Sequence, residues 1–250
     1  MSTASLTSTN WTDSKKPLWA LGLFVPILPF VLYALIEVTG INALWWLGPV
    51  ILYGVIPLLD TLIGEDRNNP PESAVAQLEA QHYYRWVVYA YIPLQFATTI
   101  MGAWIAASGS LAAWELIGLV LTVGIVNGIG INTAHELGHK RETLERWLAK
   151  LTLAPVAYGH FFVEHNRGHH VRAATPEDPA SSRMGETFWA FLPRTVIGSL
   201  RSAWELEAHR MRSEGRSVWN WRNHNLQAWS MTVLMFGALT LWLGWAALAF

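Results

Sequence analysis

Cysteine is absent from the 250 residues of the chain. Its absence excludes disulfides, thiolate-held metal ions, cysteine-ligated iron–sulfur clusters and a cysteine nucleophile within this chain. Any cysteine-ligated electron carrier must therefore come from another polypeptide. Charged residues are also scarce, at 14%, and the formal net charge of −1 provides no basic bias that would indicate nucleic acid binding.

Apolar residues dominate instead: they make up 52% of the chain, which contains fifteen tryptophans. Long apolar runs predict membrane-spanning helices at residues 18–38, 41–63, 83–107, 111–131 and 226–250. Each run is close to the roughly 20 residues that a bilayer core requires. We therefore expect an all-α integral membrane protein, a bundle of about five visible spans with a cytoplasmic, histidine-rich helical cap.

The chain is predicted to be a single domain, 1–250, with a flexible N-terminus at 1–16, four spans within 18–131, a histidine-rich region at 132–225 and a fifth span at 226–250. Within the histidine-rich region, residues 142–162 are expected to be helical and 163–184 irregular and polar. Residues 188–212 are predicted to form an amphipathic helix along the membrane interface.

The basic residues indicate the orientation in the membrane. If the spans alternate in direction, all seventeen Lys and Arg residues fall on one side, together with the histidine-rich region. The opposite turns, near 39–40 and 108–110, contain none. Because positive charge is retained on the inner side of a membrane, we expect the histidines to be cytoplasmic.

Two histidine segments are the strongest chemical signal. His135 and His139 lie in H-E-L-G-H, and His165, His169 and His170 lie in H-N-R-G-H-H. On a helix, residues four apart share one face, so each segment can direct imidazoles at a common centre. Neutral imidazole is a common ligand of iron, copper, nickel and zinc. We therefore predict a metal site at the membrane surface, directly beneath apolar helices, where a hydrophobic substrate could enter.

The metal itself is not identified by the spacing. H-E-L-G-H also matches the zinc metalloprotease pattern, in which Glu136 would act as general base. A catalytic zinc needs only three protein ligands, however, and zinc has no redox chemistry. Five histidines fit two metal ions better, and two ions beside an apolar cavity suit dioxygen activation by iron. A membrane metal-binding or transport protein without catalysis is a further alternative.

Other polar residues near the two segments are candidates for orienting the ligands through hydrogen bonds. They are Glu136, Glu164, Asp178, Asn132 and His160. Their alternative role is that of ordinary solvated or structural polar groups. The remaining histidines, His82, His209 and His224, are expected to be hydrogen-bonded or exposed.

The segments H-E-L-G-H-K (135–140), E-H-N-R-G-H-H (164–170) and A-T-P-E-D-P-A-S-S-R-M-G-E (174–186) resemble those of the membrane-bound alkane 1-monooxygenases, within the superfamily of membrane di-iron fatty acid desaturases and hydroxylases. The resemblance extends to L-Y-G-V-I-P-L-L-D (52–60), G-E-D-R-N-N-P-P-E (64–72), G-I-V-N-G-I-G-I-N-T-A-H-E-L-G-H-K (124–140) and A-Y-G-H-F-F-V-E-H-N (157–166).

This resemblance implies a di-iron centre ligated by His135, His139, His165, His169 and His170. It implies hydroxylation of medium- to long-chain n-alkanes to 1-alkanols with O2, with electrons from rubredoxin and its reductase, in the bacterial inner membrane. It also marks Leu52 as the residue that limits chain length in a substrate channel between the first four spans. A membrane fatty acid desaturase or hydroxylase is the nearest alternative.

The chain also departs from the family pattern. Two further histidine motifs, N-Y-x-E-H-Y-G and one ending H-x-D-H-H, are absent, as is a sixth span, and no histidine follows His224. We therefore expect the sequence to be truncated before its C-terminal histidine motifs.

Overall fold

The computed structural model describes residues 11–65 and 69–249, and these contain helices and turns but no β-strand. This part of the chain includes five helices long and apolar enough to cross a membrane: Lys16–Thr39, Asn42–Ile63, His82–Ala107, Ala113–Gly138 and His224–Leu243. The predictions of an all-helical fold and of an integral membrane protein are confirmed. The flexible segment predicted at 1–16 falls largely on residues 1–10, outside the described residues.

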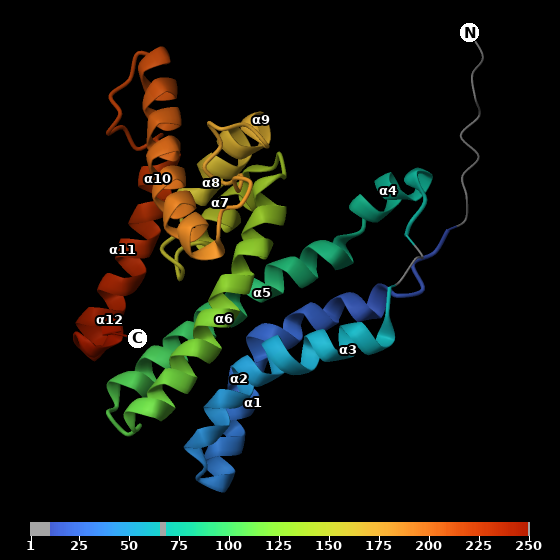
Figure 1. The fold of residues 1–250 in the computed structure, drawn as a ribbon, viewed down its shortest axis with the longest axis vertical. Coiled ribbons are helices and arrows are strands. Elements are labelled where there is room, and N and C mark those ends of the chain that lie inside the picture. The colour runs from blue at the N-terminus through green and yellow to red at the C-terminus, as the bar shows by residue number, and fades with distance from the viewer. Residues whose placement is uncertain (1–10, 66–68, 250) are drawn as a thin grey trace. The chain divides into compact units, whose positions relative to one another are not determined.

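The chain forms two compact units, which share the long helices α5 (His82–Ala107) and α6 (Ala113–Gly138). The first unit comprises Met1–Thr98 and Leu111–Val126, and the second comprises Thr99–Ser110 and Asn127–Phe250. Figure 1 shows the helices of both.

In the first unit, η1 (Lys16–Leu23) continues directly into α1 (Phe24–Thr39) to make the first candidate span. Gly40 ends this helix with φ +69°, and its N–H donates to Ile36 O at 2.7 Å. Glycine reaches this left-handed conformation without steric penalty. The tight turn predicted between the first two spans is therefore confirmed.

The second span is built from η2 (Asn42–Trp46), α2 (Leu47–Val50), η3 (Ile51–Val55) and α3 (Ile56–Ile63). The segment η3 is a π-helical turn, in which the N–H of Ile56 donates to Ile51 O. Pro57 follows it and has no N–H, so it cannot continue an α-helical hydrogen-bond ladder through this turn. Leu52 lies in the turn with 8% of its surface exposed.

The second span packs closely against the start of α6 in the first unit. Trp45 is buried, and its carbonyl accepts a hydrogen bond from Thr122 Oγ1 at 2.5 Å. A Cβ added at Gly48 would overlap the Thr122 side chain, so only glycine permits this approach. A polar segment with the short helix α4 (Glu72–Glu79) leads from this span to α5.

The second unit contains the end of α6, then α7 (Thr143–Thr152), α8 (Phe161–Val163), η4 (Glu164–His169) and α9 (His170–Arg172). The continuous helix predicted at 142–162 is wrong. It ends at Thr152, because Pro155 disfavours helix at the residue before it and Ala157 has φ +52°. The irregular segment predicted at 163–184 is also wrong in its first part, which is helical as far as Arg172.

Two long helices complete this unit: α10 (Phe188–Ser213) and α11 (His224–Leu243), followed by the short α12 (Ala246–Ala249). Thr187 Oγ1 accepts the N–H of Ala190 at the start of α10, and Asn223 Oδ1 accepts that of Asn225 at the start of α11. Both are standard N-terminal caps. The fifth span was predicted to reach residue 250, but α11 ends at Gly244, where φ is +79°.

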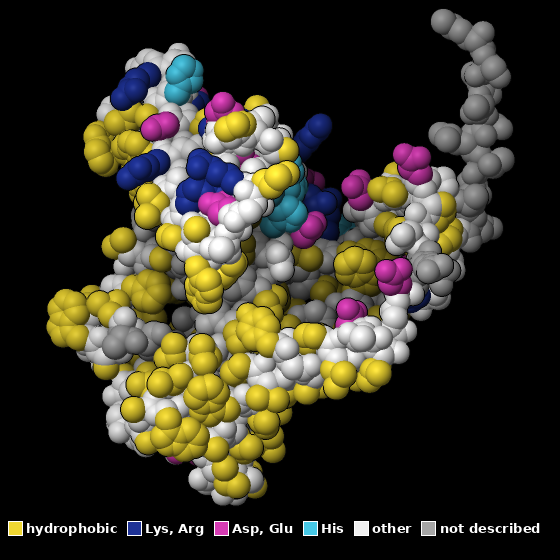
Figure 2. Space-filling model, viewed as in Figure 1, with side chains coloured by type: hydrophobic (Ala, Val, Ile, Leu, Met, Phe, Trp, Pro, Cys, Tyr) yellow, Lys and Arg dark blue, Asp and Glu magenta, His cyan; other side chains and the backbone are white. Residues whose placement is uncertain are grey.

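The helix predicted at 188–212 is confirmed as α10, and its exposed surface has two different parts. The exposed face of the first half is apolar and comprises Phe188, Trp189, Leu192, Val196, Ile197 and Leu200. The exposed positions that follow are all polar: Arg201, Glu205, His209, Arg212 and Ser213. Figure 2 shows dark-blue basic side chains over the region that α10 occupies in Figure 1. The first half of α10 thus has the apolar character of a membrane-interface helix, and the second half does not.

Candidate metal centre

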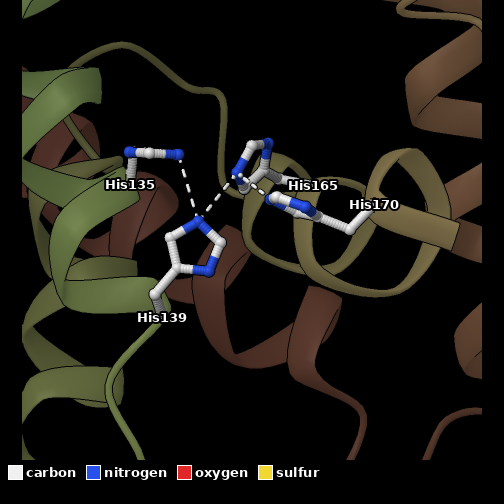
Figure 3. A group of neighbouring side chains, drawn as sticks. All are labelled: His135, His139, His165 and His170. Carbon is white, nitrogen blue, oxygen red and sulfur yellow. Dashed lines mark hydrogen bonds between the residues drawn. The ribbon is translucent and has the colours of Figure 1, made fainter. Parts of the chain in front are cut away.

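Four of the five predicted histidine ligands lie together in the second unit. His135 is on the last turn of α6, His139 follows that helix, His165 is in η4 and His170 begins α9 (Figure 3). One ring nitrogen from each lies within 4.8 Å of the others. His139 Nε2 is 3.1 Å from both His135 Nε2 and His165 Nε2, and His165 Nε2 is 3.0 Å from His170 Nε2.

Hydrogen bonds alone cannot satisfy this arrangement. His139 Nε2 and His165 Nε2 each face two other ring nitrogens. A neutral imidazole nitrogen has either one lone pair or one hydrogen, so it can serve one such neighbour only. A cation can accept all four lone pairs, and imidazole–metal distances of about 2.0–2.1 Å, as for zinc, put neighbouring donors about 2.9–3.4 Å apart. The observed spacing therefore fits a metal ion held by histidine.

The glycine of H-E-L-G-H has a packing role in this site. A Cβ added at Gly138 would lie 3.2 Å from Asn166 Nδ2, so glycine allows the end of α6 to approach η4 closely. The Asn166 amide is itself held by a hydrogen bond to Phe162 O at 2.9 Å. The ring of His165 stacks on Phe161 with a centroid separation of 4.8 Å. These contacts bring the two histidine segments together.

The second histidine segment uses a π-helical turn, which the sequence reading did not predict. The N–H of His170 donates to His165 O, five residues earlier. In an α-helix with about 3.6 residues per turn, residues five apart point about 140° apart, whereas the wider turn closed by an i→i+5 bond brings their directions much closer together. His170, and not His169, therefore supplies the fourth nitrogen of the group, next to that of His165.

His169 is oriented by a buried carboxylate. Its Nδ1 donates to Asp178 Oδ2 at 2.8 Å, which leaves Nε2 as the nitrogen with the available lone pair. Burial alone would raise the pKa of Asp178, but hydrogen bonds from Ser181, the Ala180 N–H and His169 hold it below its ordinary value. Asp178 is thus an ionised acceptor, the usual partner of a metal-binding histidine.

The electrostatics of the cluster favour uncharged imidazoles. Burial, together with the neighbouring histidines, lowers the pKa of His165 to about 4. Burial and the nearby His135 and His170 also lower the pKa of His139. Both rings are therefore neutral at pH 7, which is the form that binds a metal ion.

The other predicted positions have different surroundings. Glu136 is exposed and lies 3.4 Å from His135 Nδ1, while Asn132 is exposed on α6. Glu164 is buried and pairs with Arg172, with 2.8 Å between Oε1 and Nη2. His160 is buried against Tyr158, and its Nε2 has no hydrogen-bond partner among the described residues. None of these four lies within the nitrogen group.

A buried charged network behind the second segment was not foreseen. Glu207 on α10 is fully buried and accepts hydrogen bonds from Arg167 of the histidine segment, from Arg210 and from the His224 N–H. Lys150 Nζ lies 2.9 Å from His224 Nδ1, so His224 is hydrogen-bonded as expected. Burial lowers the pKa of Lys150 to about 8. An arginine inside H-N-R-G-H-H is the one sequence signal that could have indicated a buried carboxylate partner.

Comparison with known proteins identifies the class. The fatty acid desaturase family matches residues 108–250, more than half of the chain and the whole of both histidine segments. The chain belongs to the fatty acid desaturase family.

Within that class, the resemblance to alkane 1-monooxygenases is confirmed over nearly the whole chain. Alkane 1-monooxygenase of Pseudomonas putida is 45% identical over 241 residues, which are 96% of this chain and 60% of the relative. Alkane 1-monooxygenase 1 of Alcanivorax borkumensis is 44% identical over 235 residues, 94% of this chain and 58% of the relative. The xylene/toluene monooxygenase hydroxylase component XylM of Pseudomonas putida is 28% identical over 135 residues, 54% of this chain and 36% of the relative. The chain thus spans about 60% of the length of the two alkane 1-monooxygenases.

Proposed function

We propose that this chain belongs to an integral membrane hydroxylase that converts medium- to long-chain n-alkanes to 1-alkanols with O2. The observation that carries this proposal is the convergence of four imidazole nitrogens in a chain 44–45% identical to alkane 1-monooxygenases over more than nine-tenths of its length. An intramembrane zinc protease is less well supported, because four converging imidazoles exceed the three protein ligands of a catalytic zinc.

We assign metal binding to His135, His139, His165, His169 and His170, and the bound metal to two iron ions. Iron bound there would supply the redox chemistry that O2 activation requires. The chain's own residues present neutral nitrogens, and Asp178 holds His169 in one tautomer and orientation. No nucleophile or general base from the protein is needed for an alkane.

An alkane has no polar group to be recognised, so selectivity for a terminal carbon must depend on the shape and depth of an apolar channel. We assign the limit on chain length to Leu52, a buried side chain in the π-helical turn of the second span. That turn is flanked by apolar helix, which suits a lipid-soluble substrate. A larger side chain at this position is expected to shorten the accepted alkane.

We place the histidine segments on the cytoplasmic side of the bacterial inner membrane, on the basis of the positive-inside rule. We assign electron delivery to rubredoxin with its reductase, because the chain has no cysteine-ligated carrier of its own. Basic residues of α10 could attract an acidic carrier. Arg194 and Arg210, however, already form ion pairs with Glu186 and Glu207, which reduces the free positive charge on this surface.

Product analysis tests the proposal. Membranes that contain the full-length protein, supplied with rubredoxin, its reductase and NADH, should convert n-alkanes to 1-alkanols in a reaction that requires O2. Labelled 18O2 should place one labelled oxygen in the alcohol. A double bond introduced into an acyl chain instead would assign the protein to the desaturases, and the absence of any O2-dependent product would refute the hydroxylase assignment.

A further inference from the structure

The π-helical turn of η4 is spanned by an ion pair whose carboxylate, Glu164, is buried and whose guanidinium, Arg172, is partly exposed. Glu164 begins the turn and Arg172 ends α9, eight residues later, yet Glu164 Oε1 and Arg172 Nη2 are 2.8 Å apart. The Arg172 guanidinium also contacts Gly168 O at 3.4 Å, in the middle of the same turn. The pair therefore runs along the segment that contains His165, His169 and His170.

Gly168 provides the room for this ion pair. A Cβ added at Gly168 would overlap Glu164 Oε1 and would lie 2.5 Å from the Glu164 carboxyl carbon and 2.6 Å from Arg172 Nη2. Real Cβ atoms do not approach other heavy atoms so closely, so any side chain at this position would displace the pair. The ion pair and the glycine are thus parts of one arrangement.

The same segment is attached to α10 on both sides of the glycine. Arg172 Nη2 donates to Ser202 Oγ at 2.5 Å, and Arg167 Nη1 donates to Glu207 Oε1 at 2.5 Å. Glu207 is completely buried, whereas Arg167 is partly exposed. Breaking the Arg167–Glu207 bond would remove one of the hydrogen bonds that satisfy this buried carboxylate, so the bond opposes rearrangement of the turn.

We propose that Glu164, Gly168 and Arg172 form a positioning element that keeps η4 π-helical and so selects His170, rather than His169, as the partner of His165. Without it, the segment would relax to an α-helix, in which residues four apart share a face. The His169 ring now stacks on that of His165 at 5.7 Å, with its Nδ1 turned to Asp178. In an α-helix we expect it to replace His170 as the nitrogen neighbour of His165 and to lose its hydrogen bond to Asp178. The consequence for metal binding rests on the proposed function, but the register of the turn does not.

The cysteine-free chain allows this register to be measured directly. Two double variants of the full chain, His165→Cys with His170→Cys and His165→Cys with His169→Cys, are oxidised by diamide in detergent and chelator. A disulfide requires closely spaced Cα atoms and Cβ vectors that do not point apart. With glycine kept at position 168, the cysteines at 165 and 170 should cross-link at least about tenfold faster than those at 165 and 169, because the turn brings the first pair together.

Adding Gly168→Ala should reverse this preference, whereas Gly237→Ala on α11, where a Cβ meets nothing within 4 Å, should leave it unchanged. Arg172→Gln, which adds no bulk, should reverse it as well, and Arg172→Lys should restore it; these two variants decide the matter if Gly168→Ala does not fold. The proposal would be overturned if the 165/169 pair cross-linked faster than the 165/170 pair with glycine kept at position 168. It would also be overturned if both Gly168→Ala and Arg172→Gln left the preference unchanged. Because neither metal nor turnover is measured, a failure of the hydroxylase assignment would not affect this result.

Discussion

Asp178→Asn is the substitution that most sharply tests how the histidine segment is held. Asp178 Oδ2 accepts hydrogen bonds from His169 Nδ1 at 2.8 Å and Ser181 Oγ at 2.6 Å, and Oδ1 accepts the Ala180 N–H at 3.0 Å. An amide has one oxygen only, so its NH2 group must face either the Ala180 N–H or His169. One partly buried donor then loses its acceptor, which costs at most about 1–3 kcal/mol.

The expected result is a 10–100-fold loss of metal affinity, the usual effect of removing a carboxylate behind a metal-bound histidine, equal to about 1.4–2.7 kcal/mol. Affinity would be measured by Co2+ titration of the full-length protein in detergent against a competing chelator. Glu177→Gln is the matched control, since Glu177 is the neighbouring carboxylate and is exposed. Unchanged affinity in a folded Asp178→Asn variant, or an equal loss in the control, would refute the reasoning.

Three further predictions concern stability and specificity. Glu207→Ala should lower the free energy of unfolding in detergent by about 1.5–3 kcal/mol, because it removes the buried carboxylate that binds the partly exposed Arg167 and Arg210, whereas Glu205→Ala on the exposed face of α10 should have little effect. Burial lowers the pKa of His160 to about 4, against about 6.5 in the unfolded chain. The folded protein therefore keeps its full stability above pH 6.5 and loses up to roughly 3 kcal/mol as the pH falls towards 4. His160→Phe should reduce this loss in acid unfolding curves, and an identical curve would contradict the prediction. Leu52→Trp should shift the alcohols formed from a mixture of n-alkanes towards shorter chains, with Leu58→Trp as the exposed control on the same span; an unchanged distribution would remove Leu52 from the channel.

The membrane spans were predictable because a single physical demand, about 20 apolar residues per crossing, fixes their length. The N-terminal caps and the turn at Gly40 follow from equally local rules. The helix predicted at 142–162 extends past the end of α7 at Thr152, although Pro155 disfavours helix at the residue before it. Local chemistry thus sufficed for the elements and most of their ends.

The histidines of the site were identifiable from their spacing, but their pairing was not. An α-helical period predicts His169 as the neighbour of His165, and the rings of these two residues do stack at 5.7 Å, but it is His170 Nε2 that lies 3.0 Å from His165 Nε2. The contacts of that turn are distant in sequence: Ser202 lies 30 residues from its partner Arg172, and Glu207 lies 40 residues from its partner Arg167. Contacts of this kind arise from tertiary packing, so no local pattern announces them.

Elemental analysis of the full-length protein, purified in detergent without added metal, tests the central claim most directly. The histidine convergence and the family resemblance predict iron, about two ions per chain, with little zinc. One zinc per chain with negligible iron would contradict the claim and would favour a hydrolytic site built on H-E-L-G-H.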